Sequence, residues 1–488
     1  MTAAPVIVLF RRDLRLADNP SLAAAAASGR PVIAVYVLDD TEPHPIRGAQ
    51  KWWLHRSLLK LQAALVERGS FLVLRRNNTS AALADLARET GADLVHWARR
   101  YTRAEIETDQ LMTQDLAAAG VTTKSFMGGL LREPQDMASP SAGGPYRVFT
   151  PFFRRLSEIG PAACSAPAFE RLMTPSARPS SESLDDWRLL PKNPDWAAEF
   201  SEHWRPGEAG AWAAADAFVE GPIASYAEQR DIPAIAGTTR LSPHLAFGEA
   251  SPTALWNFIS AAGAARRLNI EKVLSEIAWR EFSHHLLHAF PQMATTPLQP
   301  KFEGFAYRDD AEGFRHWTRG LTGYPVVDAG MRQLWRTGWM HNRVRMIVAS
   351  FLTKDLLIDW RRGAEWFAQT LVDFDPASNA ANWQWVAGCG ADAAPFFRIF
   401  NPTTQGEKFD PQGDYVRRFV PELADLPAEH IHRPDAAPAG ALAAAKVRIG
   451  VDYPAPVVDH AEARRRALAA FESIGPPVAS RGTRPHVQ

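Results

Sequence analysis

The stretch VIVLFRRDLRLADNPSLAAAAAS (6–28) opens with five apolar residues in a row and continues, after a charged turn, into an alanine-rich segment. A continuous apolar run of this length is typical of a strand buried on both faces of a sheet, and the segment 19–28 has the composition of a helix. The same alternation repeats as far as residue 130. Further strands are expected at 31–39, 71–75, 93–98 and 121–126, and further helices at 50–68, 80–90 and 102–119.

Strands that alternate with helices of this length predict an α/β domain with a doubly wound (Rossmann-like) parallel sheet. The first strand runs into RRDLR (11–15) without a glycine, so the Gly-rich dinucleotide fingerprint is missing. We therefore expect residues 1–130 to form an N-terminal α/β domain that holds no dinucleotide in the usual crevice.

The rest of the chain has a different composition. Residues 131–205 are rich in Pro, Ser, Ala and Gly and predict a long connector with one short helix near 152–158. From 206 to 475 the periodicity is mostly helical, which predicts a large all-α domain. Its helices are expected at 210–220, 252–262, 271–289, 311–319, 326–338, 342–352 and 358–370. Residues 476–488 are expected to form a disordered tail.

Composition and charge exclude several classes of protein. No apolar run reaches the roughly 18 residues that span a bilayer, and the N-terminus lacks the features of a secretory signal. The two cysteines, Cys164 and Cys389, are too few for a disulfide framework or a four-cysteine zinc site, so we expect a reducing cytoplasm. The net charge of zero gives no support for nucleic-acid binding, so a DNA-binding face has to come from folding basic residues onto one side. Nothing in the sequence indicates an oligomer, and we expect a monomer.

Tryptophan is unevenly distributed. Half of the sixteen tryptophans lie between Trp279 and Trp385. For any one of them a place in a helical core is the better interpretation, because aromatic side chains dominate cores.

The segment GTTRLS (237–242) is a candidate anion site. Small hydroxyl residues and an arginine stand directly before a helix expected to begin at Pro243, where backbone N–H groups and the helix dipole favour an anion. A helix cap is the more frequent use of such residues.

The segment EIAWREF (276–282) places three chemically useful side chains on one helical face. Glu276, Trp279 and Arg280 are spaced i, i+3 and i+4, so a carboxylate, a broad π-surface and a guanidinium lie together. Such a face is able to stack a nucleobase and to hydrogen-bond its edge. An interhelical ion pair beside a core tryptophan is an equally good interpretation.

The segment TGWMHNRVRM (337–346) forms a second such face. Asn342, Arg345 and Met346 share one side of a helix, and Arg343 points away from it toward a position where a phosphate is within reach. Neither His341 nor the group His284, His285 and His288 has acids or cysteines at ligand spacing, so the sequence predicts no metal site.

The segment DFDPASNAANWQW (373–385) combines two aspartates, an asparagine and two tryptophans in a polar loop that opens a helix. Polar loop residues inside an otherwise apolar helical domain indicate a site. An elaborate helix cap is the alternative.

These four segments, in this order, resemble the photolyase/cryptochrome family, and within it the class I cyclobutane pyrimidine dimer photolyases. The segments YRVFTPFFRRL (146–156), TGYPVVDAGMRQL (322–334) and FRIFNPTTQGEKFD (397–410) are similar to that family as well. The resemblance covers nearly the whole chain, and its combined motifs are highly specific.

The resemblance implies that FAD binds inside the helical domain. Asp373 is expected to pair with Arg345, and Asn379 to face N5 of the flavin, where a neutral amide favours the reduced, anionic form. The implied cofactor-binding residues are Tyr226, Thr238, Thr239, Arg240, Leu241, Ser242, Arg280, Arg345, Asp373, Phe374, Asp375 and Asn379.

The resemblance also implies that the partner is UV-damaged DNA. Trp279 and Trp385 are expected to clasp a flipped-out dimer, while Glu276 and Asn342 hydrogen-bond its edges. The remaining implied DNA contacts are Arg280, Arg343, Met346 and Gln405, and Trp383, Trp360 and Trp317 are expected to carry electrons to the flavin from the surface. Stacking is worth about 1–3 kcal/mol per base, so two indoles roughly offset a flip that costs a few kcal/mol.

The activity that follows is light-driven splitting of the dimer by an electron from excited, reduced FAD, which makes the protein a carbon–carbon lyase. One alternative is a (6-4) photolyase, but only His341 stands where those enzymes carry a histidine pair. Another is a cryptochrome-type blue-light photoreceptor, although only a short tail follows residue 475. A flavoprotein that merely binds DNA is a third.

A second, antenna chromophore is expected from the resemblance, and its identity is open between a folate and a deazaflavin. Glu105 matches a folate contact, but Ala104 stands where that contact pairs with an asparagine.

Overall fold

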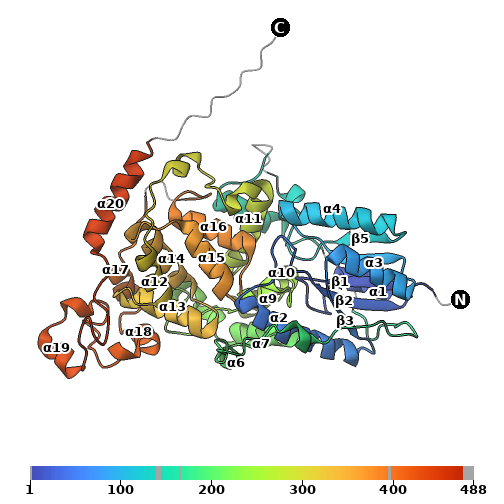
Figure 1. Ribbon diagram of the computed structural model, residues 1–488, viewed down its shortest axis with the longest axis horizontal. Coiled ribbons are helices and arrows are strands. Elements are labelled where there is room, and N and C mark those ends of the chain that lie inside the picture. Colours follow the sequence, from blue (N-terminus) through green and yellow to red (C-terminus); the bar gives the residue numbers. More distant parts are fainter. Residues whose placement is uncertain (1–2, 139–143, 164–165, 167, 394–396, 476–488) are drawn as a thin grey trace, which may run out of the picture. The chain divides into compact units, whose positions relative to one another are not determined.

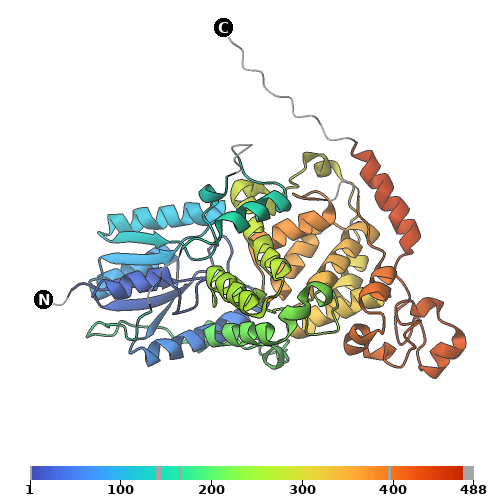
Figure 2. The same ribbon diagram turned by 180° about the vertical axis from the view of Figure 1, so that it is seen from behind.

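The computed structural model describes residues 3–138, 144–163, 166, 168–393 and 397–475. It begins with a five-stranded sheet in the order β3-β2-β1-β4-β5, in which all neighbouring strands are parallel (Figures 1 and 2). The strands are β1 Val6–Phe10, β2 Val32–Leu38, β3 Leu72–Arg76, β4 Leu94–Ala98 and β5 Thr122–Phe126. The predicted doubly wound sheet is confirmed, because runs of apolar residues fill both of its faces.

Two separate cores sandwich this sheet. Alternate residues of a strand point to opposite faces, so Val8 packs with α1 (Pro20–Ala27) and α2 (Ala49–Glu67). Leu9 packs on the other face with α3 (Thr79–Thr90) and α4 (Arg103–Ala118).

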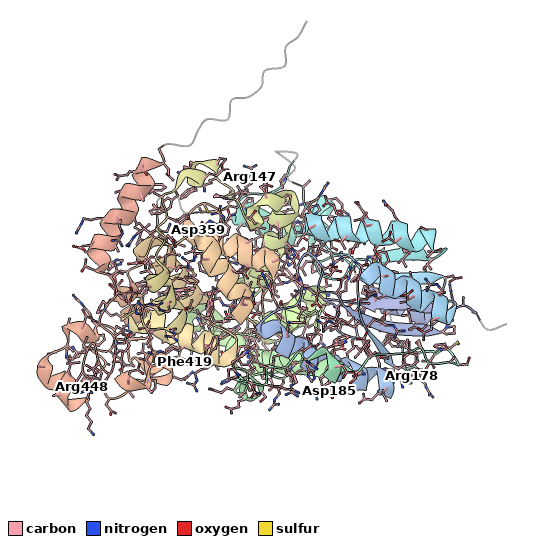
Figure 3. All side chains as sticks on the ribbon, viewed as in Figure 1. Arg147, Arg178, Asp185, Asp359, Phe419 and Arg448 are labelled. Carbon is pink, nitrogen blue, oxygen red and sulfur yellow. The ribbon has the colours of Figure 1, made fainter. Side chains whose placement is uncertain are left out.

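The connector between the sheet and the helices packs against neighbouring segments through several of its side chains. Trp187 is buried in the core beneath α2. Arg178 lies 4.8 Å over the ring of Phe71, and Arg147 lies 4.6 Å over that of Phe290; both arginines are labelled in Figure 3. The helices in this part are α5 Phe149–Ile159 and α6 Phe200–His203.

The remainder of the described chain is helical, as predicted, and holds no further strand. Two of the predicted helices, 271–289 and 311–319, coincide with the observed ones. The helices are α7 Glu208–Glu220, α8 Tyr226–Gln229, α9 Ser242–Ala246, α10 Pro252–Arg266, α11 Glu271–Ala289, α12 Ala311–Arg319, α13 Pro325–Thr337, α14 Asn342–Ser350, α15 Trp360–Thr370, α16 Pro376–Ala387, α17 Pro402–Phe409, α18 Asp414–Phe419, α19 Ala439–Ala444 and α20 His460–Ser473. A π-helical turn, Phe351–Asp355, follows α14.

Contacts divide the chain into two compact units, and neither is a single continuous stretch. Unit 1 comprises 1–291, 333–341 and 366–379, and unit 2 comprises 292–332, 342–365 and 380–488. None of the helices in the described ranges is both long and apolar enough to cross a bilayer. The predicted tail, 476–488, lies outside the described residues.

Candidate functional site

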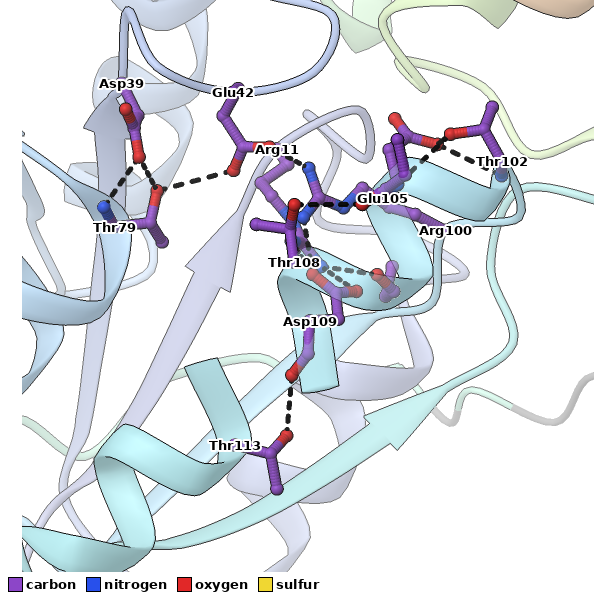
Figure 4. A network of polar contacts seen from close by, with 12 residues as sticks. Arg11, Asp39, Glu42, Thr79, Arg100, Thr102, Glu105, Thr108, Asp109 and Thr113 are labelled. Atoms are coloured by element: carbon purple, nitrogen blue, oxygen red, sulfur yellow. Dashed lines mark hydrogen bonds and ion pairs between the residues drawn. The ribbon is translucent and has the colours of Figure 1, made fainter. Parts of the chain in front are cut away.

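The carboxyl ends of the strands carry a network of paired charges (Figure 4). Arg11 follows β1 and binds Asp109 at 2.7 Å, while Arg100 follows β4 and binds both Asp109 and Glu42 at 2.5 Å. Burial raises the pKa of Asp109, but the two guanidinium groups outweigh it and hold this pKa below its ordinary value. The charges at the edge where parallel sheets usually receive ligands are therefore matched among themselves.

Glu105, the expected antenna contact, is used as a helix cap. Its carboxylate accepts hydrogen bonds from the hydroxyl and backbone N–H of Thr102, at 2.8 and 3.3 Å, and its own N–H donates to that hydroxyl. This reciprocal arrangement is a capping box at the start of α4. The antenna chromophore and its identity stay a prediction.

Arg240 is the most unusual residue of the GTTRLS segment. Its backbone is left-handed, with φ of 53°, and its guanidinium lies 4.3 Å over the ring of Trp204 and 5.2 Å over that of Trp339. Burial lowers its pKa, its Nε is buried without a hydrogen-bond partner, and no carboxylate in the described part of the chain forms an ion pair with it. A half-buried cation with no ion-pair partner among the described residues suits a phosphate-bearing ligand, and this segment therefore fits a diphosphate.

The end of the same segment is joined to the start of the DFDPASN segment. The hydroxyl of Ser242 donates to Oδ2 of Asp373 at 2.6 Å and accepts from Nε1 of Trp339 at 3.3 Å. Thr239 accepts a hydrogen bond from the N–H of Leu241 at 3.3 Å, which shapes the turn before α9. Ser242 and Asp373, 131 positions apart in sequence, thus belong to one hydrogen-bonded group, which is suited to line a cofactor site.

Glu276 is held by two cations. Arg230 is hydrogen-bonded to its carboxylate, and Lys272, one turn earlier on α11, lies 3.2 Å from it. The same Arg230 lies 5.7 Å over the ring of Tyr226, which is buried edge-on against Phe218. The ion-pair interpretation of the sequence is therefore correct for Glu276, and the carboxylate is oriented before any ligand arrives.

Trp279 is stacked on the connector. Its ring and that of Phe149 are 3.7 Å apart and inclined by only 7°, and Phe153 continues the stack at 5.6 Å from Phe149. Arg280, on the next position of α11, donates to the carbonyl of Gly129 at 2.9 Å. One face of the indole is covered, so a base that stacks on Trp279 has to use the opposite face.

Asp375 is buried and remains charged. His284 Nε2 lies 3.1 Å from its Oδ2, and the N–H of Ser378 donates to its Oδ1 at 2.7 Å. Burial raises its pKa, but the adjacent His284, the charge of Arg280 and the bond from Ser378 hold the pKa far below its usual range. Asn379, half-buried in the first turn of α16, donates its N–H to the carbonyl of Asp375 at 2.9 Å.

The expectation that these histidines have no acids at ligand spacing is wrong for His284 and His285. Folding brings Asp375 to His284, and Glu281, one turn earlier on α11, binds His285 at 3.2 Å. Each pair holds one carboxylate, and no group of three or more metal-binding side chains occurs among the described residues.

Phe374 links this loop to the sheet domain. Its carbonyl accepts a hydrogen bond from Nε2 of Gln50 on α2 at 2.9 Å, and Arg47 lies 5.9 Å over its ring. The backbone between the two aspartates is therefore fixed by α2.

In unit 2, two of the three expected electron-carrying tryptophans are neighbours. The rings of Trp317 and Trp383 are 6.3 Å apart, and Nε1 of Trp317 donates to the carbonyl of Val348 at 2.9 Å. Trp360 is wholly buried, with Arg361 5.0 Å over its ring. All three indoles are buried, and their role in electron transfer stays a prediction.

The other residues of unit 2 expected to contact DNA lie at the surface or close to it. Asn342 is exposed at the start of α14, and Arg343 lies 4.4 Å over the ring of Phe409. Trp385 is half-buried and donates its Nε1 to the carbonyl of Asp392 at 3.1 Å. Three further residues, each half-buried, are Arg345, Met346 and Gln405.

Several residues that shape these sites were not predicted. Lys272 was within reach of sequence reasoning, since it stands four positions before Glu276 on the same helical face. His284 stands four positions after Arg280 in the same way. Phe149 and Arg230 carry no such signal, because their partners lie far away in sequence.

The fold and these groups define a protein that combines a parallel α/β domain with a helical part built to hold a phosphate-bearing cofactor. Residues 6–171 match the family model described as DNA photolyase, and residues 273–473 match the FAD binding domain of DNA photolyase. The chain belongs to the DNA photolyase family, and its helical part is an FAD-binding domain. The expectations of this family and of FAD are confirmed.

Individual relatives support the assignment. A protein of Agrobacterium fabrum named deoxyribodipyrimidine photo-lyase is 53% identical over 97% of this chain and 99% of its own length. The crystal structure of a bacterial class III photolyase from Agrobacterium tumefaciens superposes with a TM-score of 0.93, covering 97% of this chain and 98% of that one at 53% identity. Cryptochrome-1 of Arabidopsis thaliana is 36% identical over 96% of this chain and 70% of its own length. The expected photolyase fold is confirmed, whereas the expected class I is not.

Proposed function

We propose that this protein repairs cyclobutane pyrimidine dimers in DNA in a light-dependent reaction. The observation that carries the proposal is the half-buried face of α11, where a carboxylate oriented by two cations stands one turn from an indole that is already stacked on one side. Such a face offers a hydrogen-bond acceptor and a π-surface to a base that has left the helix. The relative from Agrobacterium fabrum bears the name of an enzyme of this kind.

FAD fits the residues around Arg240. The half-buried guanidinium of Arg240, whose Nε has no hydrogen-bond partner, suits the diphosphate, and Thr238, Thr239 and Ser242 are assigned to the same ligand. We assign Asp373, Asp375 and Asn379 to the flavin ring, with Arg345 as the expected partner of Asp373. When bound in its reduced, anionic form, FAD supplies light-driven donation of one electron to the dimer and its recovery after two carbon–carbon bonds have split.

The chain's own residues bind and orient the lesion. Trp279 is assigned to stack one base of the dimer, and Glu276 to accept a hydrogen bond from its edge. Trp385 and Asn342 are assigned the corresponding roles from unit 2, with Met346 packing beside them and Arg280, Arg343 and Gln405 as DNA contacts. Because Trp279 is stacked on Phe149 in advance, little side-chain entropy is lost when a base arrives.

A repair assay tests the proposal. Purified protein with chemically reduced FAD is mixed with an oligonucleotide that carries one thymine dimer, and the undamaged product is quantified in blue light and in the dark. We expect repair in light only, and a large loss in Trp279→Ala. Absence of light-dependent repair by protein that has retained FAD contradicts the proposal. Repair of a (6-4) photoproduct and not of the dimer would instead identify the other photolyase activity.

A blue-light photoreceptor is the second candidate function, because the chain is 36% identical to Cryptochrome-1 of Arabidopsis thaliana. Asn379 provides the discriminating experiment. Under the repair proposal, Asn379→Asp abolishes repair and retains FAD, since a carboxylate beside the flavin disfavours the anionic reduced form.

The domain organisation, the cellular location and the oligomeric state are expected from the sequence alone. The domain boundaries 1–130, 131–205 and 206–475, the cytoplasmic location and the monomeric state remain predictions from the sequence. For the class within the family, the 53% identity to a solved class III photolyase favours class III over the class I expected from the motifs.

A further inference from the structure

His284 and Asp375 form an ion pair within a buried part of unit 1. The ring nitrogen Nε2 of His284 lies 3.1 Å from Oδ2 of Asp375, and the two side chains are only 13% and 12% exposed. The other carboxylate oxygen is occupied by the N–H of Ser378 at 2.7 Å. Both oxygens of Asp375 therefore have a close neighbour, one a backbone N–H and the other an imidazole nitrogen.

The surroundings of Asp375 contain few other titrating groups. Arg280 acts on it from the same face of α11 as His284, and His44 acts on it from the loop between β2 and α2. His44 is itself surrounded by Glu105, Arg12 and Arg100, and burial lowers its pKa. The arginines keep their charge at all relevant pH, whereas an imidazole is the kind of side chain whose charge changes near neutral pH.

We propose that His284 is a positioning residue that orients Asp375 and supplies a removable positive charge beside it. The inference rests on the proposed function, which assigns Asp375 to the flavin ring. It deepens that function by naming the residue that controls how easily the bound flavin is reduced.

The charge next to Asp375 affects how easily the bound flavin is reduced. Reduction to the anionic form adds a negative charge next to the carboxylate of Asp375, which opposes reduction. Protonated His284 compensates the negative charge of that carboxylate and so reduces its repulsion of the anionic flavin. An imidazole without its proton gives no such compensation, so reduction is harder when His284 is neutral.

Two substitutions of His284 separate this role from simple support of the fold. His284→Arg keeps a positive charge at every pH, and His284→Gln supplies none. A structural role predicts that both variants lose FAD or stability to a similar degree. The electrostatic role predicts that at pH 8 the flavin midpoint potential of His284→Arg lies above that of His284→Gln.

The experiment uses the FAD-containing protein and follows the flavin absorbance during a reductive titration at pH 5 to 9. Wild type is expected to show a steeper fall of the midpoint potential between pH 5 and 8 than either His284 variant. At pH 8 we expect His284→Arg to raise the reduced-to-oxidised ratio about tenfold above His284→Gln, which is about 30 mV for a two-electron couple. The matched control is His285→Gln, because His285 pairs with Glu281 instead and its variant should keep the wild-type pH dependence.

The outcomes are distinguishable. Curves of His284→Gln and His284→Arg that coincide with that of wild type, with FAD bound, overturn the inference and leave the proposed function intact. Protein that never binds FAD contradicts the proposed function and, with it, the inference. If His284→Gln does not fold, His284→Arg alone decides, since the loss of the extra pH dependence is expected in that variant too.

Discussion

The α-carbon of Gly363 lies directly against the indole of Trp383. A Cβ built at Gly363 would stand 2.1 Å from Cη2 of that ring and 2.6 Å from Cδ2 of Leu352. No side chain larger than hydrogen fits between α15 and this indole, so the position of Trp383 is set by the absence of a side chain.

Gly363→Ala is therefore expected to displace Trp383. Overpacking of this kind costs about 1–3 kcal/mol of stability. If Trp383 passes electrons to the flavin, as the family resemblance implies, blue-light reduction of oxidised FAD in the presence of an external donor should slow several-fold, whereas repair by chemically reduced enzyme should change much less. Gly304→Ala is the control, because nothing lies within 4 Å of a Cβ at that position. A wild-type photoreduction rate in Gly363→Ala contradicts the expectation.

Trp317 and Trp360 provide a matched pair for stability. Both are wholly buried, but Nε1 of Trp317 donates to Val348 whereas Nε1 of Trp360 has no hydrogen-bond partner. Trp317→Phe should cost about 1 kcal/mol more than Trp360→Phe, the net worth of one hydrogen bond. Urea unfolding followed by circular dichroism measures the difference. Equal losses in the two variants would show that the hydrogen bond of Trp317 contributes nothing.

Phe149 is expected to raise the selectivity for damaged DNA, through its stack on Trp279. Phe149→Ala removes a contact worth about 0.5–1.5 kcal/mol and leaves the indole free to turn. Affinity for dimer-containing DNA should fall roughly two- to tenfold by that figure, while affinity for undamaged DNA stays unchanged. Fluorescence anisotropy with both oligonucleotides tests this. Phe149→Tyr keeps the stack and should bind like wild type; a loss in Phe149→Tyr equal to that in Phe149→Ala counts against stacking as the cause.

Glu281 should make the fold sensitive to acid. It is buried and accepts hydrogen bonds from the N–H groups of Leu131 and Arg132, at 2.9 Å each. Burial raises its pKa, but His285 and these two bonds outweigh it, so the pKa in the folded protein lies below its ordinary value. A lowered carboxyl pKa stabilises the fold fully above about pH 4.3, the ordinary value for Glu, and the stabilisation is lost as pH falls through the folded-state pKa.

Glu281→Gln is the test of that pH dependence. At pH 7 the variant should lose about 1–3 kcal/mol, because two buried N–H groups lose a charged acceptor. Between pH 5 and 3 its urea midpoint should fall less steeply than that of wild type. Parallel pH profiles of the two proteins would show that Glu281 titrates alike in the folded and unfolded chains.

Ser242 should contribute to FAD affinity through its bond to Asp373. Ser242→Ala removes a hydroxyl that donates to this carboxylate at 2.6 Å, at a cost of about 1–2 kcal/mol, or roughly five- to thirtyfold in the dissociation constant of FAD. Ser473→Ala, whose hydroxyl only contacts its own helix, serves as the control. The dissociation constant is measured by flavin fluorescence, and an unchanged value would exclude Ser242 from the cofactor site.

Local sequence patterns were sufficient for the sheet and for most helices. The strands β1 to β5 were predicted to within one residue, because β1 to β4 contain apolar runs, which are a short-range signal, and β5 continues the alternation of strands and helices. The helix over 271–289 was predicted at both ends from its helical periodicity, which is also a short-range signal. The helix α16 was foreseen only as a helix opened by a polar loop, since its residues serve a site as much as a core.

The sequence by itself determined that Glu276, Trp279 and Arg280 share a face, because helical spacing alone brings them together, and the resemblance of the motifs indicated the family. Only the tertiary structure decided what each of these groups touches: Arg230 on Glu276, Phe149 on Trp279, and Asp375 on His284. The physical reason is the distance along the chain over which each kind of signal acts. Helical and strand periodicities extend over a few residues, whereas an ion pair or a ring stack depends on which distant segments the burial of apolar surface brings together.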